Sequence, residues 1–125
     1  MTTWITICDT CKREGAENRA EDNGHCTDGE TLAALIEENA NGDVRTRRFS
    51  CLMGCSRACN VSIQAHGKIA YSLGEFTPDR MAAEAILCFA RLHAESRSGQ
   101  VPYRQWPEGV RGHFVSRHPP LIDAE

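Results

Sequence analysis

The sequence feature that most constrains the fold is a cysteine-rich stretch at residues 51–59. Cys51, Cys55 and Cys59 recur at every fourth position, and Gly54 stands directly before the middle cysteine. On a helix, this spacing would place the three sulfurs on one face. The residues on both sides instead have the short β-branched or alternating patterns of strands, which favours a loop. A glycine-containing loop between two strands can fold round a metal ion held by thiolates.

A second cysteine group, Cys8 and Cys11, follows a predicted strand at residues 4–8. The chain holds seven cysteines, an odd and large number. No stretch is apolar enough to cross a membrane, and the N-terminus lacks the pattern of a signal peptide. The sequence therefore predicts a cytoplasmic protein. In that reducing compartment, clustered cysteines indicate metal binding or catalysis rather than structural disulfides.

Length and charge exclude several other classes of protein. With 125 residues the chain is long enough for one core, predicted over residues 1–98, with a proline-rich arm at residues 99–125 packed on it. The net charge of −3 argues against a nucleic-acid-binding protein. The short basic run at residues 45–48 is more typical of the solvated face of an edge strand than of a ligand site.

Periodicity predicts four strands and two helices. The strands are expected at residues 4–8, 44–50, 61–65 and 68–73, and the helices at residues 28–40 and 78–96. The order β-α-β-β-β-α predicts an α/β, thioredoxin-like fold with a four-stranded mixed sheet and two helices. The arm is expected to be irregular, with one helical turn after Pro107.

The predicted helices carry recognisable start signals and buried stripes. Thr27 and Glu30 form a capping box before the first helix. Thr77 is expected to cap the second helix, with Pro78 at its first position. The expected core faces are Leu32, Leu35 and Ile36 on the first helix, and Ala82, Ala85, Ile86, Phe89 and Leu92 on the second.

These elements and motifs resemble those of the thioredoxin-like 2Fe–2S ferredoxins and, more narrowly, those of the DUF1636 family of predicted metal-binding proteins. The stretches that carry the resemblance begin at Cys8, at Cys51 and at Val101 in the arm, and the similarity covers nearly the whole chain. It implies a metal or iron–sulfur role and a link to cobalamin or cobalt metabolism. The ferredoxins usually have proline or glycine where Cys59 stands, and they space their first cysteine pair more widely than Cys8 and Cys11.

The expected cofactor is a 2Fe–2S cluster, with zinc or cobalt as the alternative. Four thiolates would hold it, two on each iron. The expected ligands are Cys8, Cys11, Cys51 and Cys55, with Cys59 and Cys26 as further candidates. Cys59 could equally be a spare thiol beside the site or a core residue, and Cys88 is expected to be buried as a small apolar residue.

The chemistry admits three functions. The first is electron transfer or metal sensing without catalysis, with a redox partner protein or a metal-pathway enzyme as partner. The second is a thiol–disulfide oxidoreductase that uses Cys8 and Cys11, although no helix is predicted to start at this pair and lower the thiol pKa. The third is a zinc- or cobalt-binding accessory protein. A homodimer is possible in each case, and no nucleic-acid or membrane partner is expected.

Overall fold

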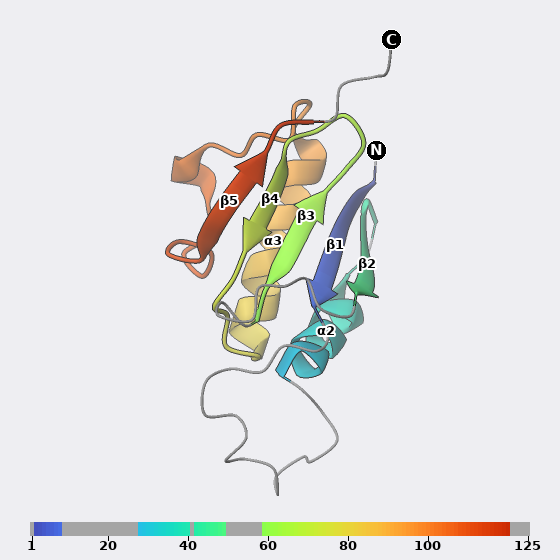
Figure 1. The fold of residues 1–125 in the computed structure, drawn as a ribbon, viewed down its shortest axis with the longest axis vertical. Coiled ribbons are helices and arrows are strands. Elements are labelled where there is room, and N and C mark those ends of the chain that lie inside the picture. Colours follow the sequence, from blue (N-terminus) through green and yellow to red (C-terminus); the bar gives the residue numbers. More distant parts are fainter. Residues whose placement is uncertain (1, 9–27, 41, 50–58, 121–125) are drawn as a thin grey trace, which may run out of the picture.

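A computed structural model describes residues 2–8, 28–40, 42–49 and 59–120 of the chain. Figure 1 shows its elements in sequence order. They are β1 (Thr3–Cys8), α2 (Asp28–Asn39), β2 (Val44–Phe49), β3 (Val61–Gln64), β4 (Ala70–Leu73), α3 (Arg80–Glu95), the 3-10 helix η3 (Tyr103–Gln105) and β5 (Phe114–His118). The first four strands and both α-helices lie where the sequence predicts them, with bounds that differ by a few residues.

The strands form one mixed sheet in the order β2-β1-β3-β4-β5. β1 and β2 are parallel, as a β-α-β unit requires, and the remaining neighbours are antiparallel. The predicted number of four strands is wrong. The fifth, β5, comes from the arm and pairs with the outer side of β4, where an edge strand still offers unpaired backbone groups.

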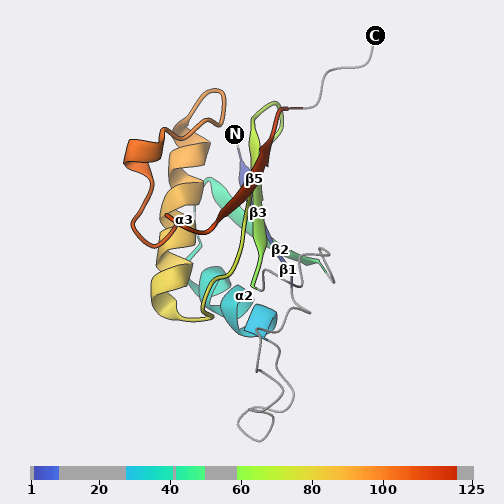
Figure 2. The same cartoon turned by 60° about the vertical axis from the view of Figure 1, so that its left-hand side comes forward.

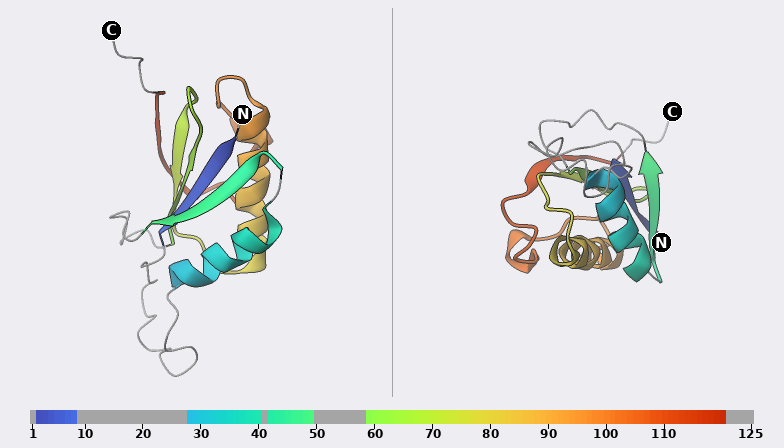
Figure 3. Two further views of the ribbon diagram at one scale, coloured as in Figure 1. Left: turned by 90° about the vertical axis from the view of Figure 1, so that its right-hand side faces the viewer. Right: turned by 90° about the horizontal axis from the view of Figure 1, so that it is seen from below.

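Both helices cover the same face of the sheet (Figures 2 and 3). The core lies between these two layers and includes Ile5 and Ile7 of β1, Ile36 of α2 and Phe89 of α3, all fully buried. Alternate residues of a strand project from opposite faces. Trp4, Thr6 and Cys8 therefore lie on the face turned away from the helices.

Most of the expected helix faces are confirmed, but the expected cap of α3 is not. Leu32 and Ile36 are buried on α2, and Ala82, Ala85, Ile86 and Phe89 are buried on α3, whereas Leu35 and Leu92 are half-buried against the core. The capping box predicted at Thr27 lies outside the described residues. The N-cap of α3 is Asp79, not Thr77 as predicted: the backbone N–H of Ala82 donates to the Asp79 carboxylate at 2.9 Å. An aspartate two residues after the threonine provides a charged acceptor for the third helical N–H, so α3 begins after Asp79 rather than after Thr77.

The arm packs on the helix side of the sheet through Trp106. The Trp106 indole N–H donates to the Val101 carbonyl at 2.7 Å, and its ring meets those of Tyr71 and Phe89 edge-on. Gly109 allows the chain to approach α3 closely, since a β-carbon there would lie 2.6 Å from that of Ala85. The 3-10 turn stands before Pro107 rather than after it, where the arm forms hydrogen-bonded turns.

Within the described ranges, the helices are too short and too polar to span a membrane.

Candidate metal centre

One end of the sheet gathers the described residues that border both cysteine-rich segments. Register pairs Cys8, the last residue of β1, with Phe49, the last residue of β2. On the other side of β1, Ile7 pairs with Val61, so the chain that leads from Cys59 into β3 enters here. Helix α2 also begins at this end (Figure 1). We call this region, defined by Cys8, Phe49 and Cys59, the cysteine end of the sheet.

Cys8 is held firmly at this end. Its backbone N–H donates to the Asn60 carbonyl at 3.2 Å, and its residue is fully buried. Because Ile7 belongs to the core under the helices, Cys8 projects from the opposite face of β1. The thiol is therefore placed beside Phe49, at the point where the chain leaves the strand, and away from bulk water.

Cys59 lies on the core side. It is fully buried and belongs to the hydrophobic core cluster together with Val61 and Phe76. Two backbone hydrogen bonds of 3.4 Å join Cys59 and Phe76 reciprocally, N–H to carbonyl in both directions. This arrangement favours a core residue among the three interpretations of Cys59, since a thiol there packs as a small apolar group.

An ion pair fixes the end of β2 to α2. The Arg48 guanidinium donates to both carboxylate oxygens of Glu37 at 2.9 Å. These charge-assisted hydrogen bonds hold the pKa of Glu37 below its ordinary value. Both side chains are partly exposed, so the pair contributes only ~0–1 kcal/mol to stability. Its structural effect is to hold in place the strand that leads into Cys51.

Four of the six candidate ligands lie outside the described residues: Cys11, Cys51 and Cys55 of the expected set, and the less certain Cys26. Within the described parts of the chain, no three His, Cys, Asp or Glu residues lie close enough together to hold a metal ion. The structure thus brings Cys8 and Cys59 to the same end of the sheet and leaves the rest of the ligand set as a sequence prediction.

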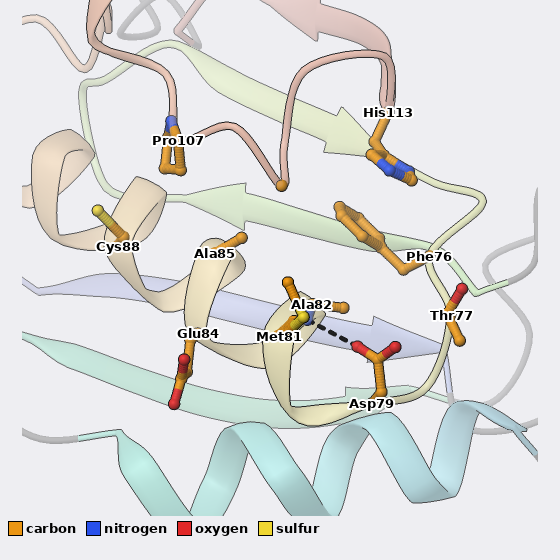
Figure 4. A pocket seen from close by; sticks show the side chains of 11 residues that line it. Phe76, Thr77, Asp79, Met81, Ala82, Glu84, Ala85, Cys88, Pro107 and His113 are labelled. Carbon is orange, nitrogen blue, oxygen red and sulfur yellow. Dashed lines mark hydrogen bonds between the residues drawn. The ribbon is translucent and has the colours of Figure 1, made fainter.

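Cys88 is exposed on α3, so its predicted burial is wrong. The buried positions around it are taken by Leu87 and Phe89. Its thiol lines the rim of a cavity of about 470 Å³ between α3 and the arm (Figure 4). His113 lies on the opposite side of this cavity from Cys88 (Figure 4).

His113 has a structural role at the cavity wall. Its ring stacks on Phe76 at 4.4 Å, and its Nδ1–H donates to the Gly74 carbonyl at 2.9 Å. Two acidic groups of the lining are engaged as well, because Asp79 caps α3 and Glu84 pairs with Arg80 at 3.5 Å. The cavity therefore offers a mainly apolar surface that the His113 ring and the Cys88 thiol border.

Comparison with known proteins supports the family resemblance. A family model described as "Protein of unknown function (DUF1636)" matches residues 5–120. The chain belongs to the DUF1636 family. No match was found among the curated proteins, and none among the solved structures.

The DUF1636 match spans both cysteine groups and reaches beyond β5, so the fifth strand lies within the family's sequence range. The structure also contains a buried polar cluster that the sequence patterns did not reveal. His93, fully buried on α3, donates from Nε2 to the Ile69 carbonyl at 2.7 Å and accepts from the Thr3 hydroxyl at Nδ1, 2.9 Å away. Burial is the main cause that lowers the pKa of His93, which keeps the ring neutral.

Lys68 completes this cluster. Its Nζ donates to the carbonyls of His93 and Ala94 at 3.1 and 2.9 Å, so the ammonium caps the C-terminal end of α3. The sequence gives only two signals for this cluster: a lysine just after the 66–67 turn and a histidine late in a helix. Both signals are equally typical of exposed residues. The cluster joins the start of β1, the segment before β4 and the C-terminal end of α3, at the end of the sheet opposite the cysteine end.

Proposed function

We propose that this DUF1636 protein is a small iron–sulfur protein that carries a 2Fe–2S cluster at the cysteine end of the sheet and acts in electron transfer or metal sensing. The proposal rests on one observation: the described residues that border the two cysteine-containing segments lie at the same end of the sheet. Cys8, Asp28, Phe49 and Cys59 bracket the two segments that hold the other candidate ligands. Together these segments and their boundaries account for six of the seven cysteines.

Chain length supports the ligand set. A chain spans at most about 3.6 Å per residue. Cys51 follows Phe49 by two residues, Cys11 follows Cys8 by three, and Cys55 precedes Cys59 by four. The Cα atom of each of these residues can therefore lie no farther than about 15 Å from a described residue at the cysteine end. Chain length thus allows the four thiolates to meet at this end, where they would fit a 2Fe–2S cluster, which would supply one-electron transfer when bound.

The topology supports a thioredoxin-like core for this protein. The parallel pair β1 and β2, the antiparallel hairpin of β3 and β4 and the two covering helices match the element order predicted from the sequence. We infer that β5 and the arm are additions to this core. The cytoplasmic location predicted from the sequence accords with the proposal, because a reducing compartment keeps the thiols available as ligands.

The described residues do not favour the oxidoreductase alternative. A catalytic thiol must reach its substrate, and its pKa is usually lowered at a helix N-terminus. Cys8 is fully buried, and α2 begins only at Asp28. Zinc or cobalt held by the same thiolates remains the alternative that an experiment must separate, because four cysteines also suit zinc.

Serine variants of anaerobically purified protein test the ligand set. The wild type is expected to be red-brown and to give an EPR signal after one-electron reduction. Cys8→Ser and Cys51→Ser should lose the visible absorption or change it strongly, because each removes one thiolate ligand. Cys11→Ser and Cys55→Ser should behave in the same way.

Cys88→Ser is the matched control, since this thiol is exposed on α3 and remote from the cysteine end. Its spectrum should equal that of the wild type, and Cys59→Ala should keep the cluster as well. Wild-type absorption in the Cys8→Ser variant would refute the proposed ligand set. If Cys26→Ser is colourless and Cys11→Ser keeps the wild-type spectrum, Cys26 takes the place of Cys11 in the ligand set.

A further inference from the structure

The sheet face turned away from the helices carries exposed aromatic and basic side chains. We call it the open face, defined here by Trp4, Thr6, Arg45, Arg47 and Phe49. Trp4 is 37 % exposed and Phe49 is 57 % exposed. The helices and the η3 part of the arm lie on the other side of the sheet (Figures 2 and 3). Large aromatic side chains exposed on one face of a sheet are among the features of contact sites.

Register places these side chains in a regular row. Trp4 pairs with Arg45, Thr6 with Arg47, and Cys8 with Phe49, and partners in a ladder share a face of the sheet. The two arginines therefore lie between and beside the two aromatic residues. The row runs along β1 and β2 and ends at the cysteine end.

Arg47 is held in place across the sheet by neutral groups. Its Nε donates to the Thr6 hydroxyl at 2.7 Å, and its Nη2 donates to the Gln64 side-chain carbonyl at 3.3 Å. Neither acceptor carries a charge, so the guanidinium is oriented but its positive charge is not neutralised. Such an oriented arginine is well suited to a carboxylate, which it can bind through two hydrogen bonds.

The open face has a charge opposite to that of the whole chain. Its strand positions in the described part of the chain carry no aspartate or glutamate, and Arg45 and Arg47 form no ion pair with another described residue. The chain as a whole has a net charge of −3. A positive face on a negative molecule orients an approaching acidic surface toward that face.

We propose that the open face docks a partner protein that presents carboxylates interspersed with apolar side chains. The carboxylates would pair with Arg45 and Arg47, and the apolar side chains would cover Trp4 and Phe49. A second copy of the chain fits poorly, because two open faces would bring their arginines together. Nucleic acid is the less favoured class, since two arginines on an acidic chain supply little phosphate binding.

The row of side chains on the open face ends beside Cys8, so docking at this face would serve electron transfer. A partner seated on the open face would lie against the cysteine end, where short distances favour electron exchange with a cluster. This last step rests on the proposed iron–sulfur function, whereas the docking surface itself does not require it.

The test is calorimetric titration of the full chain with two probe proteins at low salt: cytochrome b5, which is acidic, and cytochrome c, which is basic. We expect cytochrome b5 to bind, cytochrome c not to bind, and the binding to weaken as salt is added. The double variant R45E/R47E should weaken binding by about tenfold or more. NMR amide shifts should change in β1 and β2.

The matched control is R91E/R97E, which makes the same change in net charge on exposed arginines of the helix side. It should bind as the wild type does. No binding of cytochrome b5 at low salt, or equal losses in both double variants, would overturn the docking surface. Tighter binding of single-stranded oligothymidylate, with shifts at Trp4 and Phe49, would instead make it a nucleic-acid surface.

Iron is determined separately in the same samples. Binding of cytochrome b5 by protein that holds no cluster would keep the docking surface and remove the proposed function. If protein that holds the cluster fails to bind cytochrome b5, the proposed function is kept and the docking surface is removed.

Discussion

Replacing Tyr71 by phenylalanine is expected to destabilise the protein through a single buried hydrogen bond. The Tyr71 hydroxyl accepts from the backbone N–H of Val101 at 3.1 Å, and Val101 is only 3 % exposed. Phenylalanine keeps the ring and its edge-on contact with Phe89 at 5.0 Å. The substitution therefore isolates the loss of one acceptor from the loss of packing.

The magnitude follows from the group left behind. A buried backbone N–H without a partner costs ~1–3 kcal/mol. For a chain of this size, 1 kcal/mol corresponds to about 4 °C in melting temperature, so Tyr71→Phe should lower the Tm by about 4–12 °C. Urea denaturation followed by circular dichroism measures the free energy of unfolding directly.

Tyr103→Phe is the control for this prediction. Tyr103 is 61 % exposed, and its hydroxyl makes no hydrogen bond within the described part of the chain. Its loss should change stability by less than ~0.5 kcal/mol. If the two variants have the same free energy of unfolding, the Val101 bond does not anchor the arm to the sheet and the reasoning fails.

Three further predictions concern stability. Burial lowers the pKa of His93 in the folded state, so the unfolded chain binds a proton at this residue more readily. The free energy of unfolding should therefore be highest above about pH 6.5 and should fall as the pH drops below it. Urea denaturation that gives the same free energy of unfolding from about pH 7.5 to 5.5 would contradict this. Gly99→Ala should cost ~1–3 kcal/mol more than Gly67→Ala, because both have positive φ but only at Gly99 would a β-carbon lie within 3 Å of its neighbours; equal melting temperatures would refute it. Asp79→Ala should cost ~1 kcal/mol by denaturation and Thr77→Ala almost nothing, whereas the reverse order would restore Thr77 as the cap.

Local patterns predicted most of the fold because each depends on neighbouring residues. The apolar spacing on α3 and the alternation around Ile5 and Ile7 are set by helix and strand periodicity, which the sequence displays directly. The cap of α3 was misplaced by two residues, since Thr77-Pro78 and Asp79 both carry start signals and only the chain geometry selects between them.

Long-range pairing explains what the sequence could not predict. β5 has no alternating pattern, and it becomes a strand because β4 offers it an unpaired edge. The exposure of Cys88 depends on how the arm crosses α3. The contacts of His93 with Thr3 and Lys68 join residues far apart in the chain, so no local signal marks them.

The candidate site was predicted in part. The cysteine spacing marks the segments at residues 8–11 and 51–59, and sheet register explains how their borders meet, since parallel β1 and β2 end together. The separation of Cys8 from Cys59 by sheet face depends on strand alternation and on how Cys59 packs against Phe76. Spacing alone does not contain that information.

Determination of iron, acid-labile sulfide and zinc in anaerobically purified protein tests the central claim most directly. The account predicts iron and sulfide in equal amounts, with little zinc, because a 2Fe–2S cluster contains one sulfide for each iron. Zinc bound without sulfide, persisting after reconstitution with iron and sulfide, would contradict it.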